Sequence, residues 1–262
     1  MKIYKARTSW ADSFPELLSM WQESGYCEII QTEGKFTWAN EVGDALLHEH
    51  DRVSELPKWN VALFANQIHE SQDASPWIYW ARHPRNLENV IDEGILNFDE
   101  RDIESIFLGK VENPIQGEAR TKYDWSTCVK EFSMPIEMWR PGNYKLSNID
   151  YLKKIKRSKF GLCLPGYGPK CQREIELMGL GVVPIVTPNV NTEYYDSLRK
   201  DVHYLYAEDP TQVSDVISSC SRNKWLQMSR NCVDWYFRNC SREGSFEATR
   251  YIIDELKERK KT

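Results

Sequence analysis

A strand–loop–helix–strand pattern between residues 159 and 188 constrains the fold of this chain more than any other feature. The segment reads KFGLCLPGYGPKCQREIELMGLGVVPIVTP. Its two apolar runs, 160–164 and 182–186, have the length of buried strands. Between them, residues 169–180 combine Gln, Arg, Glu, Leu and Met, which favour a helix, with a proline suited to its first turn. The glycine-rich loop therefore follows a strand, where an α/β protein binds its ligand.

Strands and helices alternate in the same way along the rest of the chain. The strands expected in the first hundred residues are 2–4, 27–30, 45–47, 61–65 and 77–80, with helices at 13–22 and 87–93. After a polar join at 97–102, further strands are expected at 105–108 and 202–206, and helices at 147–157, from 209, at 224–238 and at 246–258. Ser147 and Asp209 are suited to cap two of these helices. The pattern predicts an α/β fold of two Rossmann-like domains facing across a cleft.

Composition narrows the classes of partner. The chain has 39 acidic and 34 basic residues and a net charge of −5, so its overall charge gives no reason to expect a nucleic-acid partner. The basic run 257–261 is either a solvated helix end or a binding tail, and we favour the first. No apolar stretch reaches the length of a signal peptide core or a membrane span, so we expect no transmembrane segment.

The seven cysteines are scattered and form no CxxC pair. Cys220, Cys232 and Cys240 lie in helix-like sequence, and we expect core thiols there and neither a metal site nor disulfides. This usage is typical of a reduced, cytoplasmic protein.

The loop before the helix at 169–180 has the residues of an anion site. A helix N-terminus carries about half a positive charge and unpaired N–H groups, which favour phosphate. Gly166 and Gly168 permit close backbone approach, and Lys170 and Arg173 add cations. Glu176 shares a helix face with Arg173 and could accept both hydroxyls of a ribose. The alternative is a structural turn with Arg173 and Glu176 as a solvated pair. Neither the GxxxxGK[ST] loop nor the GxGxxG fingerprint is present.

This region resembles the donor half of the exostosin-type glycosyltransferases. In that family a Ser-x-Phe-x-Leu strand and a Pro/Gly loop precede an Arg-x-x-Glu helix and a Gly-x-x-Pro-Val strand. Residues 158–186 are similar, with Gly-Val-Val-Pro-Ile at 181–185. Tyr151 and the segment 107–109 followed by Arg120 also resemble the family. The resemblance covers about residues 104–210. Cys171 stands where a small hydroxyl residue is usual, and the chain is shorter than most members, closer to the small xylosyltransferase type of large algal viruses.

The resemblance implies a GT-B fold with three parts. Residues 1–100 would bind the acceptor, 101–244 the nucleotide sugar, and 245–262 would form a helix crossing back to the first domain. It implies inverting transfer of a sugar from a UDP-sugar, with xylose as first candidate, to a hydroxyl of an oligosaccharide or glycoprotein-glycan acceptor. No cofactor or metal is expected, and no Asp-x-Asp motif is present. The alternative is a catalytically silent nucleotide- or glycan-binding protein on the same scaffold.

The resemblance and the loop together give a set of donor-binding candidates. They are Gly109, Lys110, Arg120, Ser158, Gly166, Tyr167, Gly168, Lys170, Arg173 and Glu176.

The catalytic base is expected in the first domain, in the polar segment 65–76. It holds His69, Glu70 and Asp73, and its alternative reading is a polar surface loop. We favour Asp73, because Pro76 shortly after it restrains the local backbone.

Two other segments could bind a ligand or could have only a structural role. Residues 48–51, His-Glu-His-Asp, could bind a metal, but a charged turn at a strand end is the preferred interpretation. Trp77, Tyr79 and Trp80 could stack on a sugar or pack in the core.

Overall fold

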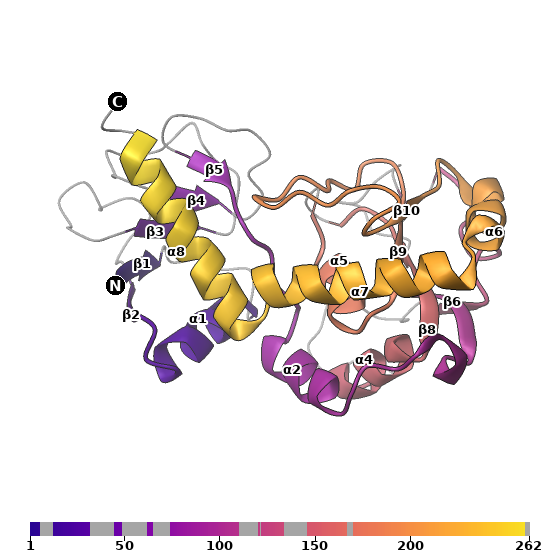
Figure 1. The fold of residues 1–262 in the computed structure, drawn as a ribbon, viewed down its shortest axis with the longest axis horizontal. Coiled ribbons are helices and arrows are strands. Elements are labelled where there is room, and N and C mark those ends of the chain that lie inside the picture. The colour runs from indigo at the N-terminus through magenta and orange to yellow at the C-terminus, as the bar shows by residue number, and fades with distance from the viewer. Residues whose placement is uncertain are drawn as a thin grey trace. The chain divides into compact units, whose positions relative to one another are not determined.

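The computed structural model of the chain describes residues 1–5, 13–31, 45–48, 62–64, 74–109, 120, 122–133, 146–166 and 170–259 (Figure 1). It is an α/β protein with two five-stranded sheets in which the strand pairs are parallel, as the sequence predicts. The chain divides into two compact units. One comprises Met1–Arg85, Glu193–Ser197 and Phe237–Thr262, and the other comprises Asn86–Thr192 and Leu198–Tyr236.

The first unit holds the sheet β2-β1-β3-β4-β5. Its strands are β1 (Lys2–Lys5), β2 (Glu28–Gln31), β3 (Ala45–His48), β4 (Ala62–Phe64) and β5 (Ala74–Pro76). Two helices, α1 (Ser13–Glu23) and α8 (Arg242–Arg259), pack with it. Figure 1 shows α8, in yellow, running beside the strands of this unit. Ile3, Trp21 and Ile252 share one apolar core, so the last helix completes the core that begins at β1.

Two tryptophans fix α8 through hydrogen bonds to its hydroxyls. The indole N–H of Trp21 donates to Ser245 Oγ at 2.9 Å, and that of Trp77 donates to Thr249 Oγ1 at 2.8 Å. The expected strand at 77–80 is wrong, because the strand β5 ends at Pro76 and residues 77–80 have no regular structure. Trp77, Ile78 and Trp80 are all buried, so this apolar run packs in the core without forming a strand.

The second unit holds the sheet β10-β9-β8-β6-β7. Its strands are β6 (Ile103–Leu108), β7 (Glu131–Ser133), β8 (Ser158–Cys163), β9 (Val183–Val186) and β10 (Leu205–Tyr206). The helices are α2 (Pro84–Asp92), α4 (Asn148–Lys156), α5 (Gln172–Gly179), α6 (Pro210–Ser219) and α7 (Arg222–Asn239), with a short 3-10 turn, η3 (Phe98–Glu100). The strand β7 was not expected from the sequence.

The order of the strands locates the binding edge of the second sheet. In chain order the five strands run 2-1-3-4-5 across the sheet, so the direction of winding reverses between β6 and β8. Ligands of such sheets bind at the carboxyl ends of the strands beside this reversal. The strand β6 ends at Leu108 and β8 ends at Cys163, so the loops after these two residues flank the expected site.

The two N-cap residues predicted from the sequence, Ser147 and Asp209, are confirmed. Ser147 Oγ accepts the N–H of Asp150 at 3.1 Å, and Asp209 Oδ1 accepts the N–H of Thr211 at 2.8 Å. Both hydrogen bonds are those of an N-cap. The helix α5 begins at Gln172, later than the expected start at 169, with Cys171 as its N-cap residue.

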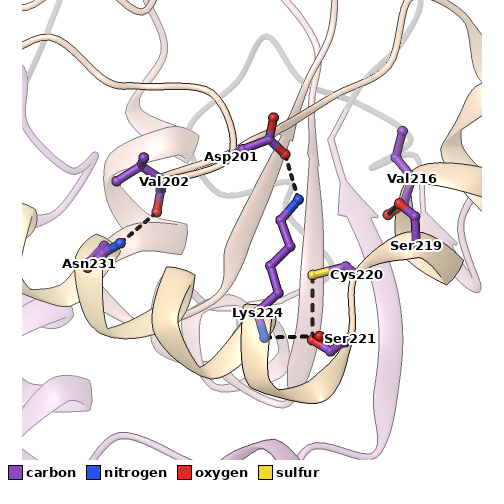
Figure 2. A network of polar contacts seen from close by, with 8 residues as sticks. All are labelled: Asp201, Val202, Val216, Ser219, Cys220, Ser221, Lys224 and Asn231. Atoms are coloured by element: carbon purple, nitrogen blue, oxygen red, sulfur yellow. Dashed lines mark hydrogen bonds and ion pairs between the residues drawn. The ribbon is translucent and has the colours of Figure 1, made fainter.

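The expected strand at 202–206 is mostly a turn. Only Leu205–Tyr206 pairs in the sheet, because Asp201 has a left-handed φ of 61° and reverses the chain before it. An ion pair and a hydrogen bond join the turn to α7, as Figure 2 shows. Lys224 Nζ lies 2.6 Å from Asp201 Oδ1, and Asn231 Nδ2 donates to the carbonyl of Val202 at 3.1 Å.

The seven cysteines are free thiols, and Cys220, Cys232 and Cys240 are buried, as expected for core positions. In the described part of the chain, no helix is both long enough and apolar enough to cross a membrane.

Candidate functional site

The helix α5, which begins at Gln172, is the next helix after β8, which ends at Cys163. Cys171, the N-cap residue, forms no side-chain cap hydrogen bond, so the first N–H groups of this helix receive no acceptor from it. The partial positive charge of this helix end is therefore directed to the edge of the sheet where the winding reverses. An anion site at this helix end stays a prediction of the sequence.

Arg173 is held at the carboxyl end of β6. It lies on α5, and its Nη2 donates to the carbonyl of Leu108, the last residue of β6, at 3.2 Å. Its guanidinium carbon lies 4.4 Å from the ring centroid of Phe107, a favourable cation–π position. A Cβ at Gly109 would lie 2.4 Å from Arg173 Nη2. A larger residue at position 109 would therefore displace the Arg173 guanidinium from this position.

A second arginine lies beside the first. Arg120 is 4% exposed, and it donates to the carbonyls of Leu164 and Pro165 in the loop after β8. Burial, and next the positive charge of Arg173, lower the pKa of Arg120 to about 10. Arg120 thus stays charged at neutral pH although a like charge is close to it. Lys170, just before the N-cap residue, is 1% exposed. Bringing like charges together is costly unless a negative charge lies close to both.

Glu174 is the carboxylate nearest the start of α5, and the sequence analysis did not single it out. Its side chain is 0% exposed. Among the described residues, neither of its oxygens accepts a hydrogen bond. Burial raises its pKa to about 7, and the charge of Arg173 opposes this shift. An acidic residue in a first helical turn is usually solvated, so sequence alone gave no sign of this burial.

Glu176 lies one helical turn after Arg173 and has a partner on another helix. The hydroxyl of Tyr151, on α4, donates to Glu176 Oε2 at 2.9 Å. Burial, and then the charge of Glu176, hold the pKa of the Tyr151 phenol well above its usual value, so Tyr151 remains a donor. Tyr151 belonged to the family resemblance, but it was not among the predicted site residues.

Six of the predicted donor-binding residues lie near the carboxyl ends of β6 and β8, and Ser158 lies away from them. Gly109, Arg120, Gly166, Lys170, Arg173 and Glu176 lie on or next to the loops and helix at the carboxyl ends of β6 and β8. Ser158 begins β8, about 16 Å from its carboxyl end at 3.3 Å per residue. Its hydroxyl donates to the carbonyl of Ile155 at 2.7 Å, so it has a structural role at the opposite edge.

The other predicted site residues lie outside the described part of the chain. They are Lys110, Tyr167 and Gly168 of the donor set, and His69, Glu70 and Asp73 of the catalytic set. Of the segment 48–51 only His48 is described, at the end of β3. Within the described ranges, no group of three His, Cys, Asp or Glu side chains could hold a metal ion.

No protein-family model matches the sequence. No curated protein sequence matches it either. Among solved structures, the chain is similar to an alpha1,3-fucosyltransferase crystallised with GDP-fucose, at 16% identity and a TM-score of 0.46. It is also similar to an alpha1,3-fucosyltransferase with GDP, at 15% identity and a TM-score of 0.48. Each similarity covers 87% of this chain and 80% of the other.

Proposed function

We propose that this protein is a glycosyltransferase that takes its sugar from a nucleoside diphosphate sugar. The observation that carries the proposal is the pair of arginines, Arg120 and Arg173, held near the N-terminus of α5 and close enough for their charges to interact. Glycosyl transfer expels a diphosphate, whose developing charge must be stabilised by fixed positive groups. Two arginines, a buried lysine and a helix N-terminus at one strand edge supply such groups without rearrangement.

In this proposal the parts of the site have separate roles. Arg120, Arg173 and the first N–H groups of α5 hold the diphosphate. Glu176, with Tyr151 beside it, accepts the ribose hydroxyls. Uridine is the first candidate for the nucleoside and xylose for the sugar, from the resemblance to the exostosin type. The same resemblance supports a GT-B arrangement, inverting transfer to a hydroxyl of a glycan, and no requirement for metal.

Replacing Arg173 or Glu176 by alanine should weaken binding of the nucleoside diphosphate. Each variant loses a charge-assisted hydrogen bond, so we expect a loss of about 1.5–3 kcal/mol, roughly a 10- to 150-fold rise in Kd. Isothermal titration with UDP, GDP, ADP and CDP measures the affinity and identifies the preferred nucleoside. The fold of each variant is checked by circular dichroism.

Two matched controls separate ligand contacts from structural effects. Arg157→Ala removes an exposed arginine paired with Asp102 and should leave the affinity unchanged. Tyr151→Phe removes the hydrogen bond to Glu176 but keeps its carboxylate, so it should cost less than Glu176→Ala. Unchanged affinity in both Arg173→Ala and Glu176→Ala would remove α5 from the binding site.

Sugar transfer should persist in the presence of a chelator. The leaving diphosphate is stabilised in this proposal by Arg120, Lys170 and Arg173, and a divalent ion has no necessary part. Activity is measured with a panel of nucleotide sugars and glycan acceptors, with and without EDTA. A loss of activity that added metal restores would contradict this mechanism. Nucleotide binding without turnover across the whole panel would favour the catalytically silent alternative.

A further inference from the structure

Glu174 is a buried carboxylate close to two arginines. It is fully buried in the first turn of α5, and neither oxygen accepts a hydrogen bond from the described residues. An ionised carboxylate without hydrogen bonds is strongly disfavoured inside a protein. What offsets this cost is first the positive charge of Arg173, next the nearby backbone N–H groups of Glu174 and Cys171, and then the charge of Arg120.

The groups facing Glu174 from neighbouring segments are two cations and two thiols. Arg173 comes from α5, Arg120 from the segment before Tyr123, Cys171 from the N-cap and Cys163 from the end of β8. Burial raises the pKa of Cys171 to about 12 and that of Cys163 well above its usual value. Both thiols therefore stay neutral, and both arginines stay charged. Glu174 is the member of this cluster that changes charge near neutral pH, since burial raises its pKa to about 7.

We propose that Glu174 is the proton-linked counter-charge of the diphosphate site, taking up one proton from solvent when the diphosphate binds beside Arg120 and Arg173. The inference rests on the proposed function and deepens it. In the empty site the carboxylate partly neutralises the two arginines. A bound diphosphate takes over that role and also repels the carboxylate. Glu174 then becomes neutral, and the proton comes from the buffer.

The direction of the pH effect follows from linkage. Binding that takes up a proton is favoured where protons are abundant, so the affinity falls as the pH rises through the pKa of the free site. Each pH unit above that value costs at most about tenfold in affinity for one proton. At pH 7, where Glu174 is about half ionised, binding should take up about half a proton.

The test compares wild type with Glu174→Gln, whose amide matches the protonated carboxyl in shape and charge. Binding of UDP and of inorganic pyrophosphate is titrated calorimetrically from pH 6 to pH 8. Buffers with different enthalpies of ionisation report the number of protons taken up. The ionisation of the ligand itself affects both proteins equally, so the ratio of their Kd values isolates Glu174. Glu104→Gln, which changes an exposed carboxylate on β6, is the matched control.

We expect the ratio of wild-type to Glu174→Gln Kd to rise about tenfold between pH 6 and pH 8. The proton uptake at pH 7 should disappear in Glu174→Gln and persist in Glu104→Gln. A constant ratio, with equal proton uptake in all three proteins, would overturn the role of Glu174 and leave the donor site intact. If neither probe binds wild type at any pH, the donor site itself is wrong, and this inference fails with it.

Discussion

Replacing Arg101 by methionine should lower the free energy of unfolding by about 3–5 kcal/mol. Arg101 is 2% exposed and donates five hydrogen bonds to the carbonyls of Leu96, Lys156, Ser158 and Leu180. Two of these carbonyls lie at the C-terminal ends of α4 and α5, where backbone acceptors lack partners within the helix. Methionine fills similar space but donates no hydrogen bond, so buried acceptors would be left unsatisfied.

Urea unfolding followed by circular dichroism measures this loss. Arg101→Lys keeps the charge with fewer donors, and it should fall between wild type and Arg101→Met. The matched control is Arg222→Met, which removes an exposed arginine paired with Asp99 and should change the stability by less than about 1 kcal/mol. An equally small change in Arg101→Met would show that the carbonyls find other partners.

Asp73→Asn should lower the rate of sugar transfer about 10²–10⁴-fold while leaving donor binding unchanged. Inverting transfer needs a base within hydrogen-bond reach of the acceptor hydroxyl, and the loss of such a base has this size. In the proposed GT-B arrangement the base comes from the part of the chain that binds the acceptor, between β4 and β5. Asparagine keeps the shape of the side chain and cannot accept the proton.

The transfer rate is measured at saturating donor, and donor affinity is measured separately by calorimetry. A variant with normal donor affinity and a low rate identifies the base. Near-normal turnover in Asp73→Asn would pass the role to Glu70 or His69, tested as Glu70→Gln and His69→Asn. If all three variants turn over normally, the base lies outside this segment.

Features set by neighbouring residues were predictable from the sequence. Ser147 and Asp209 cap α4 and α6 because the hydrogen bond of an N-cap spans only two or three residues. The position of the glycine loop between β8 and α5 followed from the apolar run before it and the helix formers after it. These signals placed Arg173 and Glu176 on one helix at the end of a buried strand.

Features that depend on distant residues were not predictable. The apolar run at 77–80 resembles a strand, but Trp77 packs in a core with residues of α8 and donates a hydrogen bond to Thr249, far along the chain. Ser158 shares the family pattern, yet its position at the start of β8 directs it to the opposite edge of the sheet. The burial of Glu174 requires β8 and Arg120 to enclose it, and no spacing within α5 encodes that.

The packing of α8 on the first strands has a consequence for the synthesis of the protein. Trp21 and its partner Ser245 are 224 residues apart, and Ile252 shares the core of Ile3. A ribosome releases the N-terminal strands long before α8 exists, whereas residues 86–192 and 198–236 of the other unit are all made before α8. Domains complete during translation fold as they emerge. The sheet that is synthesised first is therefore the last to gain a complete core.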